Sequence, residues 1–271
     1  MYKIFDAHTH IYPDNLAPKA VGNLGAFYRY GVQCDGTFDG FLKNAREGGV
    51  DGFLLLTVVT NAHQVPVVNN FAADCMKRGR EAGLTALSFC GIHQDMTDEE
   101  KEKELERCRE MGMTGVKLHP DIQGIDLDDK RLFPLYEMLT EKNLPVCFHM
   151  GDERPDMNFS EPEKLIRLKE KFPDLKVIAA HFGGYKIWDR AEEIFAGREG
   201  IMFDCSSSLS YMTRERAKRI IERLGTENIM FGTDHPSLTA KGEVDNFLRI
   251  ELTEKEREDI LWNNAARFLG V

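Results

Sequence analysis

Eight short apolar runs recur along the chain at nearly regular intervals, and this repetition limits the folds open to it more than any other feature. They cover residues 4–6, 53–59, 85–91, 115–118, 145–149, 177–181, 201–205 and 229–232. The steps between their first residues are 49, 32, 30, 30, 32, 24 and 28, close to the length of one strand-plus-helix unit. Because the runs are too short for buried helices and rich in Val, Ile, Leu and Phe, we predict eight β-strands.

Charged amphipathic segments fill the intervals between these runs and predict helices. The clearest cover residues 98–111, 132–142, 161–172, 214–224 and 254–268. Thr97, Ser160 and Thr253 precede acidic first turns, a pattern typical of helix N-caps. Strands that alternate with helices indicate a parallel sheet covered by helices. Eight such units in 271 residues match a (β/α)8 TIM barrel, whose usual size is about 250 residues.

An open, doubly wound sheet is the alternative α/β arrangement, but the glycine-rich phosphate fingerprint expected after its first strand is absent. No linker rich in Pro, Gly or Ser divides the chain, so we expect residues 1–271 to form a single domain. The first step, 49 residues against 30 to 32 for the next four, indicates an insertion after strand one at residues 13–35. Its glycines are typical of a loop that covers one end of the barrel.

Composition narrows the class of partner. The chain has 35 basic and 45 acidic residues, a formal charge of −10, which argues against nucleic acid. No apolar run approaches the roughly 20 residues of a membrane span, and the N-terminus lacks a signal-peptide pattern. We therefore expect a cytoplasmic protein whose partner is a small-molecule substrate. The six cysteines form no C-x-x-C, and we expect Cys90, Cys147 and Cys205 to be small core residues.

Seven of the eight histidines lie at or just past the end of a predicted strand. In a barrel, the loops after the strands meet at one opening, which holds the active site. His8 and His10 alternate on strand one, so their side chains project to the same side with Cα atoms about 6–7 Å apart. Two imidazoles at that separation can bind one metal ion.

Further polar residues follow the later strands at matching positions. His149, His181 and Asp234 end the runs of strands five, six and eight, and Lys117 lies in that of strand four. Each alone could be a satisfied buried group or a helix cap, and Lys117 could pair with a barrel carboxylate instead of touching substrate or metal. Together, their matching positions favour a metal site at one end of the barrel.

Six motifs, taken in order, resemble the amidohydrolase superfamily, specifically the amidohydrolase-2 type related to aminocarboxymuconate-semialdehyde decarboxylase. They are D-A-H-T-H at 6–10, G-V-K-L-H-P at 115–120, H-M-G-D at 149–152, A-A-H-F-G-G at 179–184, F-G-T-D-H-P at 231–236 and N-N-A-A-R-F-L-G at 263–270. The resemblance extends over essentially the whole chain and specifies the superfamily, not the substrate.

The resemblance implies a divalent ion, zinc in the first place and manganese as the alternative, held by His8, His10, His149 and Asp234 together with a water. Asp234 would also act as a base, and His181 would be the acid–base residue beside the metal-bound water. Lys117 leaves the metal count open. In binuclear members a carboxylated lysine on strand four bridges two ions, and the histidines equivalent to His149 and His181 bind the second. We favour one ion.

Candidate substrate-binding residues are His119, Arg154 in the loop after strand five, and Trp188, with the serines at 206–208 as a further part of the pocket wall. Arg154 could pair with a substrate carboxylate or remain solvated, and Trp188 could equally pack a helix.

Two kinds of chemistry use the same ligands. The main expectation is hydrolysis of an amide, ester or lactone bond of a small, carboxylated molecule by a metal-activated water. The alternative is non-hydrolytic decarboxylation of an unsaturated or aromatic acid, and a non-catalytic metal-binding barrel is a third, weaker hypothesis. Association into a homo-oligomer stays open.

Overall fold

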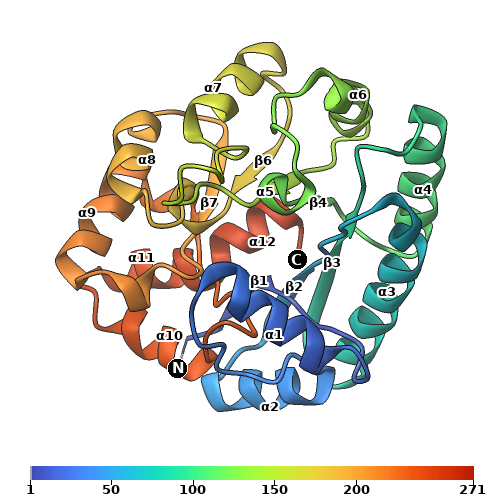
Figure 1. The fold of residues 1–271 in the computed structure, drawn as a ribbon. Coiled ribbons are helices and arrows are strands. Elements are labelled where there is room, and N and C mark those ends of the chain that lie inside the picture. The colour runs from blue at the N-terminus through green and yellow to red at the C-terminus, as the bar shows by residue number, and fades with distance from the viewer. Residues whose placement is uncertain (1) are drawn as a thin grey trace.

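Eight parallel strands form one sheet in the order β1 to β8 in the computed structural model, which describes residues 2–271. The strands are β1 Phe5–Thr9, β2 Gly52–Leu56, β3 Thr85–Gly91, β4 Val116–Leu118, β5 Val146–Phe148, β6 Val177–Ala179, β7 Ile201–Asp204 and β8 Ile229–Met230. Backbone hydrogen bonds from Ala7 to Phe231 and from His10 to His235 join β1 to the segment that begins after β8. The sheet therefore forms the predicted (β/α)8 barrel, with helices around it (Figure 1).

The helices between the strands follow the predicted alternation. They are α1 Ala17–Tyr28, α2 Phe38–Gly48, α3 Val65–Glu81, α4 Asp98–Glu110, α5 Pro120–Gln123, α6 Phe133–Glu141, α7 Pro162–Lys171, α8 Trp188–Phe195, α9 Arg214–Leu224, α10 Ala240–Leu248, α11 Glu254–Glu258 and α12 Asn264–Leu269. Short 3₁₀ turns are η1 Ala62–Gln64, η2 Lys130–Leu132, η3 His181–Gly183, η4 Leu209–Tyr211 and η5 Thr226–Asn228. Among residues 2–271, every helix is too short or too polar to cross a lipid bilayer.

The N-termini of the helices show which of the predicted caps form. Thr97 and Thr253 both form capping boxes, each with a glutamate three residues on. Ser160 does not cap α7, because its hydroxyl bonds to Asp121 and accepts from the Gly151 amide instead. The predicted helix over 254–268 is divided by a π-helical turn at Asp259–Asn263.

The barrel interior and the layer between sheet and helices form two separate apolar cores. The interior core is built from side chains that alternate along the strands, namely Phe5, Ala7, Leu54, Leu56, Leu87, Phe89, Cys147, Ile178, Ala180, Met202 and Met230. Ala265, with Phe268 and Leu269 beside it, extends this core from α12, so the C-terminal helix closes one end of the barrel (Figure 1). Cys90, Cys147 and Cys205 are buried free thiols, as expected.

A register shift in β1 changes the direction of its side chains. Asp6 pairs with Phe53 but Thr9 pairs with Leu55, so two residues of β1 oppose one residue of β2. Such a bulge reverses the alternation of side chains beyond it. Phe5 and Ala7 therefore point into the barrel core, and His8 and His10 also reach the interior, at its open end.

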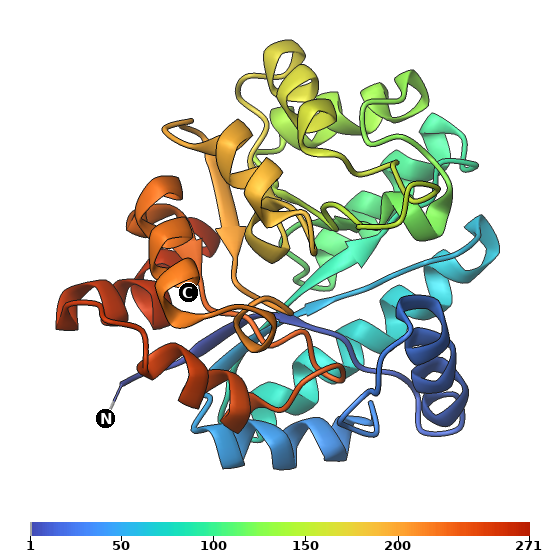
Figure 2. The same ribbon diagram turned by 60° about the vertical axis from the view of Figure 1, so that its left-hand side comes forward.

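Residues 13–35 contain the helix α1 where the glycine content suggested a loop. Pro18 lies in the first turn of α1, where the backbone amide would have no hydrogen-bond partner within the helix. The residue after the helix, Arg29, caps its C-terminus with a left-handed φ of 58°. Figure 2 shows α1 (dark blue) at the end toward which the neighbouring strands run, away from both chain termini. Its last residue, Tyr28, lines the cavity described next.

Candidate metal centre

Three ligand atoms meet where β1 and the segment after β8 lie side by side. The Nε2 atoms of His8 and His10 are 3.2 Å apart. They lie 3.5 and 3.3 Å from Oδ1 of Asp234. All three residues were predicted as ligands, and their donor atoms lie within 4.8 Å of one another.

The hydrogen bonds of the two imidazoles show where their protons lie. His8 Nδ1 donates to Asp204 Oδ2 at 2.9 Å, and His10 Nδ1 donates to the Leu56 carbonyl at 2.8 Å. Burial lowers the pKa of His8 to about 4, which keeps its imidazole neutral. The neutral His8 imidazole has its one proton on Nδ1, so its Nε2 lone pair faces His10 Nε2 and the Asp234 carboxylate. Two imidazole nitrogens and a carboxylate oxygen this close together fit a divalent cation with nitrogen and oxygen ligands.

His149 and His181 form a second pair of facing nitrogens. His149 Nδ1 lies 3.0 Å from His181 Nε2. The opposite nitrogens donate to backbone carbonyls, His149 Nε2 to Gly151 at 3.1 Å and His181 Nδ1 to Ser206 at 3.0 Å. The structure thus places His149 beside His181 and not within the close group of His8, His10 and Asp234.

Asp204, at the end of β7, supports both groups and was not singled out from the sequence. Its Oδ2 accepts from His8 Nδ1, and its Oδ1 accepts from the backbone amides of His181 and Ser206 at 3.1 Å each. Burial alone would raise the pKa of Asp204, but the His8 imidazole outweighs it and holds this pKa below its usual range. The signal was present, because Asp204 is a polar residue in an apolar run, as His149 and His181 are.

Three site residues have a left-handed backbone that side chains other than glycine rarely adopt. The φ angles are 60° at His181, 45° at Ser207 and 62° at Asp234. Ser207 donates to Asp234 Oδ2 at 2.5 Å, which leaves Oδ1 facing the histidines. Strained backbone of this kind costs about 1–3 kcal/mol per residue and is common where function fixes a side chain.

A narrow cavity of about 60 Å³ lies over these groups. It is lined by His8, His10, Tyr12, Leu24, Tyr28, Val58, Lys117, His119, Ile122, His149, His181 and Asp234. The Lys117 ammonium is buried and donates to Cys147 Sγ at 3.6 Å. The His119 imidazole stacks on that of His149, with ring centroids 4.0 Å apart.

Two of the candidate substrate residues lie outside this cavity. Arg154 is held by Asp152, with N–O distances of 2.6 and 2.8 Å, and donates to the Phe27 carbonyl of α1 at 2.6 Å. Its guanidinium therefore joins the inserted helix to the loop after β5. Trp188 is buried behind His181 and donates from Nε1 to its backbone carbonyl at 3.1 Å. Neither side chain lines the cavity.

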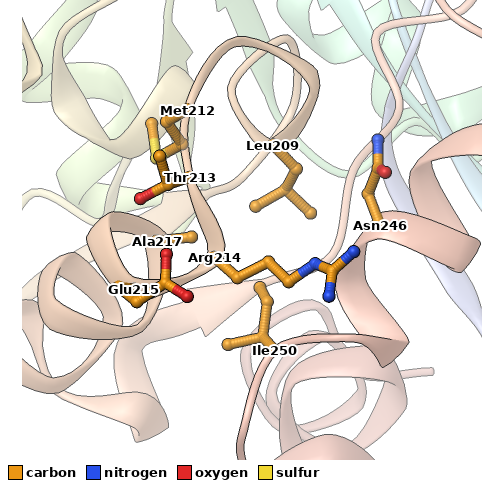
Figure 3. Close-up of a pocket in the computed structure, with 8 residues that line it drawn as sticks. All are labelled: Leu209, Met212, Thr213, Arg214, Glu215, Ala217, Asn246 and Ile250. Atoms are coloured by element: carbon orange, nitrogen blue, oxygen red, sulfur yellow. The ribbon is translucent and has the colours of Figure 1, made fainter.

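Two larger pockets among residues 2–271 have linings of a different kind. A mainly apolar pocket of about 590 Å³ between α1, β2 and α3 shares His10, Tyr12 and Val58 with the metal cavity. Figure 3 shows a separate pocket of about 330 Å³ beside α9 and α10, which Arg214 spans. Its eight lining residues include one carboxylate, Glu215, and no histidine. The chemistry is therefore concentrated in the cavity over His8, His10 and Asp234.

Comparison with known proteins identifies the family of this chain. Residues 5–271 match a family model described as amidohydrolase. The chain belongs to this amidohydrolase family. The family is metal-dependent, and the predicted superfamily is therefore confirmed.

Individual relatives of this amidohydrolase are distant. A curated 2-amino-3-carboxymuconate-6-semialdehyde decarboxylase of Dictyostelium discoideum is 25% identical over 205 residues, which cover 62% of this chain and 57% of that protein. An uncharacterised TIM-barrel protein of Bordetella bronchiseptica superposes with a TM-score of 0.81 at 19% identity, covering 99% and 98% of the two chains. A dihydroxybenzoic acid decarboxylase of Polaromonas, solved with manganese and 2-nitroresorcinol, has a TM-score of 0.74 at 17% identity and covers 100% and 97%.

The role of Asp204 can be tested apart from the ligands themselves. We expect Asp204→Asn to weaken Mn²⁺ binding by about 10- to 100-fold, because an amide holds the His8 proton less firmly than a carboxylate does. Calorimetric titration of the metal-free protein with Mn²⁺ measures this affinity. The control is Asp174→Asn, on the exposed turn before β6, for which we expect no change. Equal affinities for Mn²⁺ in the two variants would contradict the role.

Proposed function

We propose that this chain is a metal-dependent decarboxylase that releases CO2 from a small unsaturated or aromatic carboxylic acid. The observation that carries the proposal is the close group of ligand atoms on His8, His10 and Asp234. Its place in an amidohydrolase barrel whose curated relative is a decarboxylase supports lyase chemistry. Hydrolysis, the first expectation from the sequence, is less well supported, because the curated relatives and several of the similar structures are named for decarboxylation.

We propose one divalent ion per chain, either Mn²⁺ or Zn²⁺, with His8, His10 and Asp234 as ligands and His149 as the fourth after a small shift of its ring. The bound ion would act as a Lewis acid toward the substrate's oxygen atoms. His149, His181 and Lys117 are the groups that would serve a second ion. A content of two ions per chain would assign them to that role. Residues 1–271 would act as one catalytic domain.

His181 is the proposed acid–base residue. Its Nδ1 proton is engaged by the Ser206 carbonyl, so Nε2 is the atom free to exchange a proton. Loss of CO2 leaves an electron pair on carbon that must receive a proton. His181 Nε2, which faces both His149 Nδ1 and the cavity, would take up a proton and deliver it to that carbon. Asp204 holds the His181 backbone amide and so fixes the position of this ring.

The size of the cavity requires the inserted helix to move. About 60 Å³ holds only a few water molecules, less than any aromatic acid needs. The adjoining pocket of about 590 Å³ has a wall in common with it, formed by His10, Tyr12 and Val58, and also contacts α1. A shift of α1 away from the barrel would join the two volumes. Substrate entry and closure would then both depend on residues 13–35.

The test compares two products on one panel. Purified protein loaded with Mn²⁺ is incubated with hydroxybenzoates and unsaturated monocarboxylic acids, and with amides, esters and lactones of similar size. We expect release of CO2 from the first group and no hydrolysis of the second. Hydrolysis without CO2 release would restore the first expectation from the sequence. No turnover of any compound would count against both and favour the metal-binding barrel.

A further inference from the structure

Four tyrosines gather beside the histidines, from the inserted segment and from the loops after β6 and β7. The rings of Tyr28 and Tyr30 are stacked with centroids 5.7 Å apart, and Tyr185 meets Tyr28 edge to face at 5.5 Å. Tyr211 meets Tyr185 at 6.5 Å. The Tyr185 ring also lies 5.8 Å from that of His181. We call these four residues the tyrosine cluster.

The phenolic proton of Tyr28 has no acceptor among residues 2–271. The Tyr28 hydroxyl lies 2.7 Å from His119 Nε2. His119 Nδ1 accepts from the Ile122 amide at 3.3 Å, so this nitrogen carries no proton. The His119 imidazole therefore has its proton on Nε2 and donates it to the Tyr28 oxygen. The Tyr28 hydroxyl can therefore donate its own proton to a ligand bound in the cavity that Tyr28 lines.

Tyr185 provides a second hydroxyl without an acceptor, next to the Tyr28 ring and not among the residues that line the cavity. Its side chain is 3% exposed, and its oxygen is buried without a hydrogen-bond partner among the described residues. A buried hydroxyl without a partner costs about 1–3 kcal/mol, so such groups call for a ligand or an ordered water. The Tyr30 hydroxyl differs, because it bonds to Ser237 Oγ at 2.6 Å.

The charges around the tyrosine cluster favour an uncharged ligand atom. Arg154 lies over the Tyr28 ring but is paired with Asp152. Lys186 lies over the Tyr185 ring but is paired with Glu153 at 2.7 Å. Both nearby cations are thus already neutralised by carboxylates. A second carboxylate of a substrate would therefore find no unpaired cation here to balance its charge. A hydroxyl or carbonyl oxygen needs only neutral hydrogen-bond donors, which the tyrosines provide.

We propose that Tyr28 and Tyr185 form a substrate subsite that donates two hydrogen bonds to an uncharged oxygen, a hydroxyl or carbonyl, of an aromatic or unsaturated acid. This inference rests on the proposed function, because the acid's carboxyl group is taken to lie over His8, His10 and Asp234. The subsite selects monocarboxylic acids that carry an additional oxygen. The subsite also couples substrate binding to the position of α1. Tyr28 is the last residue of this helix, so its hydroxyl reaches the substrate only when α1 lies over the barrel.

Binding of three probes to the Mn²⁺-loaded protein tests this, by calorimetry and without turnover. The probes are benzoate, 3-hydroxybenzoate and isophthalate. We expect 3-hydroxybenzoate to bind most tightly. Tyr28→Phe and Tyr185→Phe should each weaken its binding by about five- to tenfold, the value of one hydrogen bond, and leave benzoate within about twofold. Tyr30→Phe is the matched control and should change neither.

Several results would overturn the subsite. They are equal binding of benzoate and 3-hydroxybenzoate by the unmodified protein, no binding of either, tighter binding of isophthalate, or unchanged selectivity in both phenylalanine variants. If one variant does not fold, the other and the unmodified protein still decide. Failure of the proposed function is distinguishable, because it appears as absent CO2 release while the order of probe affinities is retained.

Discussion

Replacing Asp234 with asparagine is expected to lower kcat/KM by about a thousandfold or more and to release most of the bound metal. Asp234 contributes the one anionic ligand atom of its group, 3.3 Å from His10 Nε2 and 3.5 Å from His8 Nε2. An amide oxygen carries no net charge and binds a divalent ion far more weakly than a carboxylate does. Metal content by elemental analysis and CO2 release on a found substrate measure the two effects.

Two comparisons make this result specific to the site. Asp174→Asn, on an exposed turn, should retain metal and activity. Removal of the metal from the unmodified protein with a chelator should abolish CO2 release, and added Mn²⁺ should restore it, whereas added Mn²⁺ should restore Asp234→Asn only in part. Full metal content and full activity in Asp234→Asn would show that the ligand set is wrong.

The barrel could be predicted because each strand must be apolar on both faces. The runs that begin at residues 85, 177 and 201 coincide with the first residues of β3, β6 and β7, and the segment 214–224 coincides with α9. Such strands read as continuous apolar runs whatever their neighbours are. Polar residues at their ends stand out for the same reason, which is how His8, His10 and Asp234 could be found.

Local pattern could not separate ligand candidates from structural histidines. His235 also follows a strand, yet its Nδ1 bonds to Asn44 at 3.1 Å and it does not line the cavity. His149 follows a strand and lines the cavity, but the structure pairs it with His181. These outcomes depend on rotamers and hydrogen bonds from other strands, which spacing along one strand does not specify.

The bulge in β1 is a second feature that the sequence concealed. His8 and His10 were expected on one side of a regular strand, whose other side would face away from them. The structure places Phe5 and Ala7 in the barrel core as well, because the extra residue reverses the alternation. No residue type in this stretch requires a bulge. The register of the hydrogen bonds to β2 therefore determines where the bulge forms.

Residues 13–35, predicted to be an insertion, were interpreted least well. Their glycines suggested a loop, but Gly22 and Gly25 lie inside α1, and Arg154 fixes the end of that helix through the Phe27 carbonyl. The same contact removes Arg154 from the cavity. Both facts come from an interaction between residues 127 positions apart in the chain. Helix and strand propensities are estimated from neighbouring residues, so they cannot indicate a partner that is distant in the chain.

His181 is the residue whose loss should separate chemistry from metal binding. His181→Asn is expected to lower kcat by about 10²- to 10⁴-fold, the usual contribution of a proton donor, because asparagine cannot carry a proton to carbon. The metal content should stay at one ion per chain, since His181 lies outside the group of His8, His10 and Asp234. The control is Asp174→Asn, on the exposed turn before β6, which should retain kcat.

The pattern of the His181→Asn result distinguishes two roles for that side chain. A fall in kcat with a small change in KM and full metal content indicates an acid–base residue. A parallel loss of metal and activity would instead make His181 a ligand, and its neighbour His149, 3.0 Å away, would then share that ion. The pH dependence of kcat adds an independent reading, because one limb of the profile should disappear in His181→Asn only if the imidazole exchanges the proton. Unchanged kcat together with an unchanged pH profile would remove His181 from the mechanism and leave Asp234 as the remaining proton acceptor of the site.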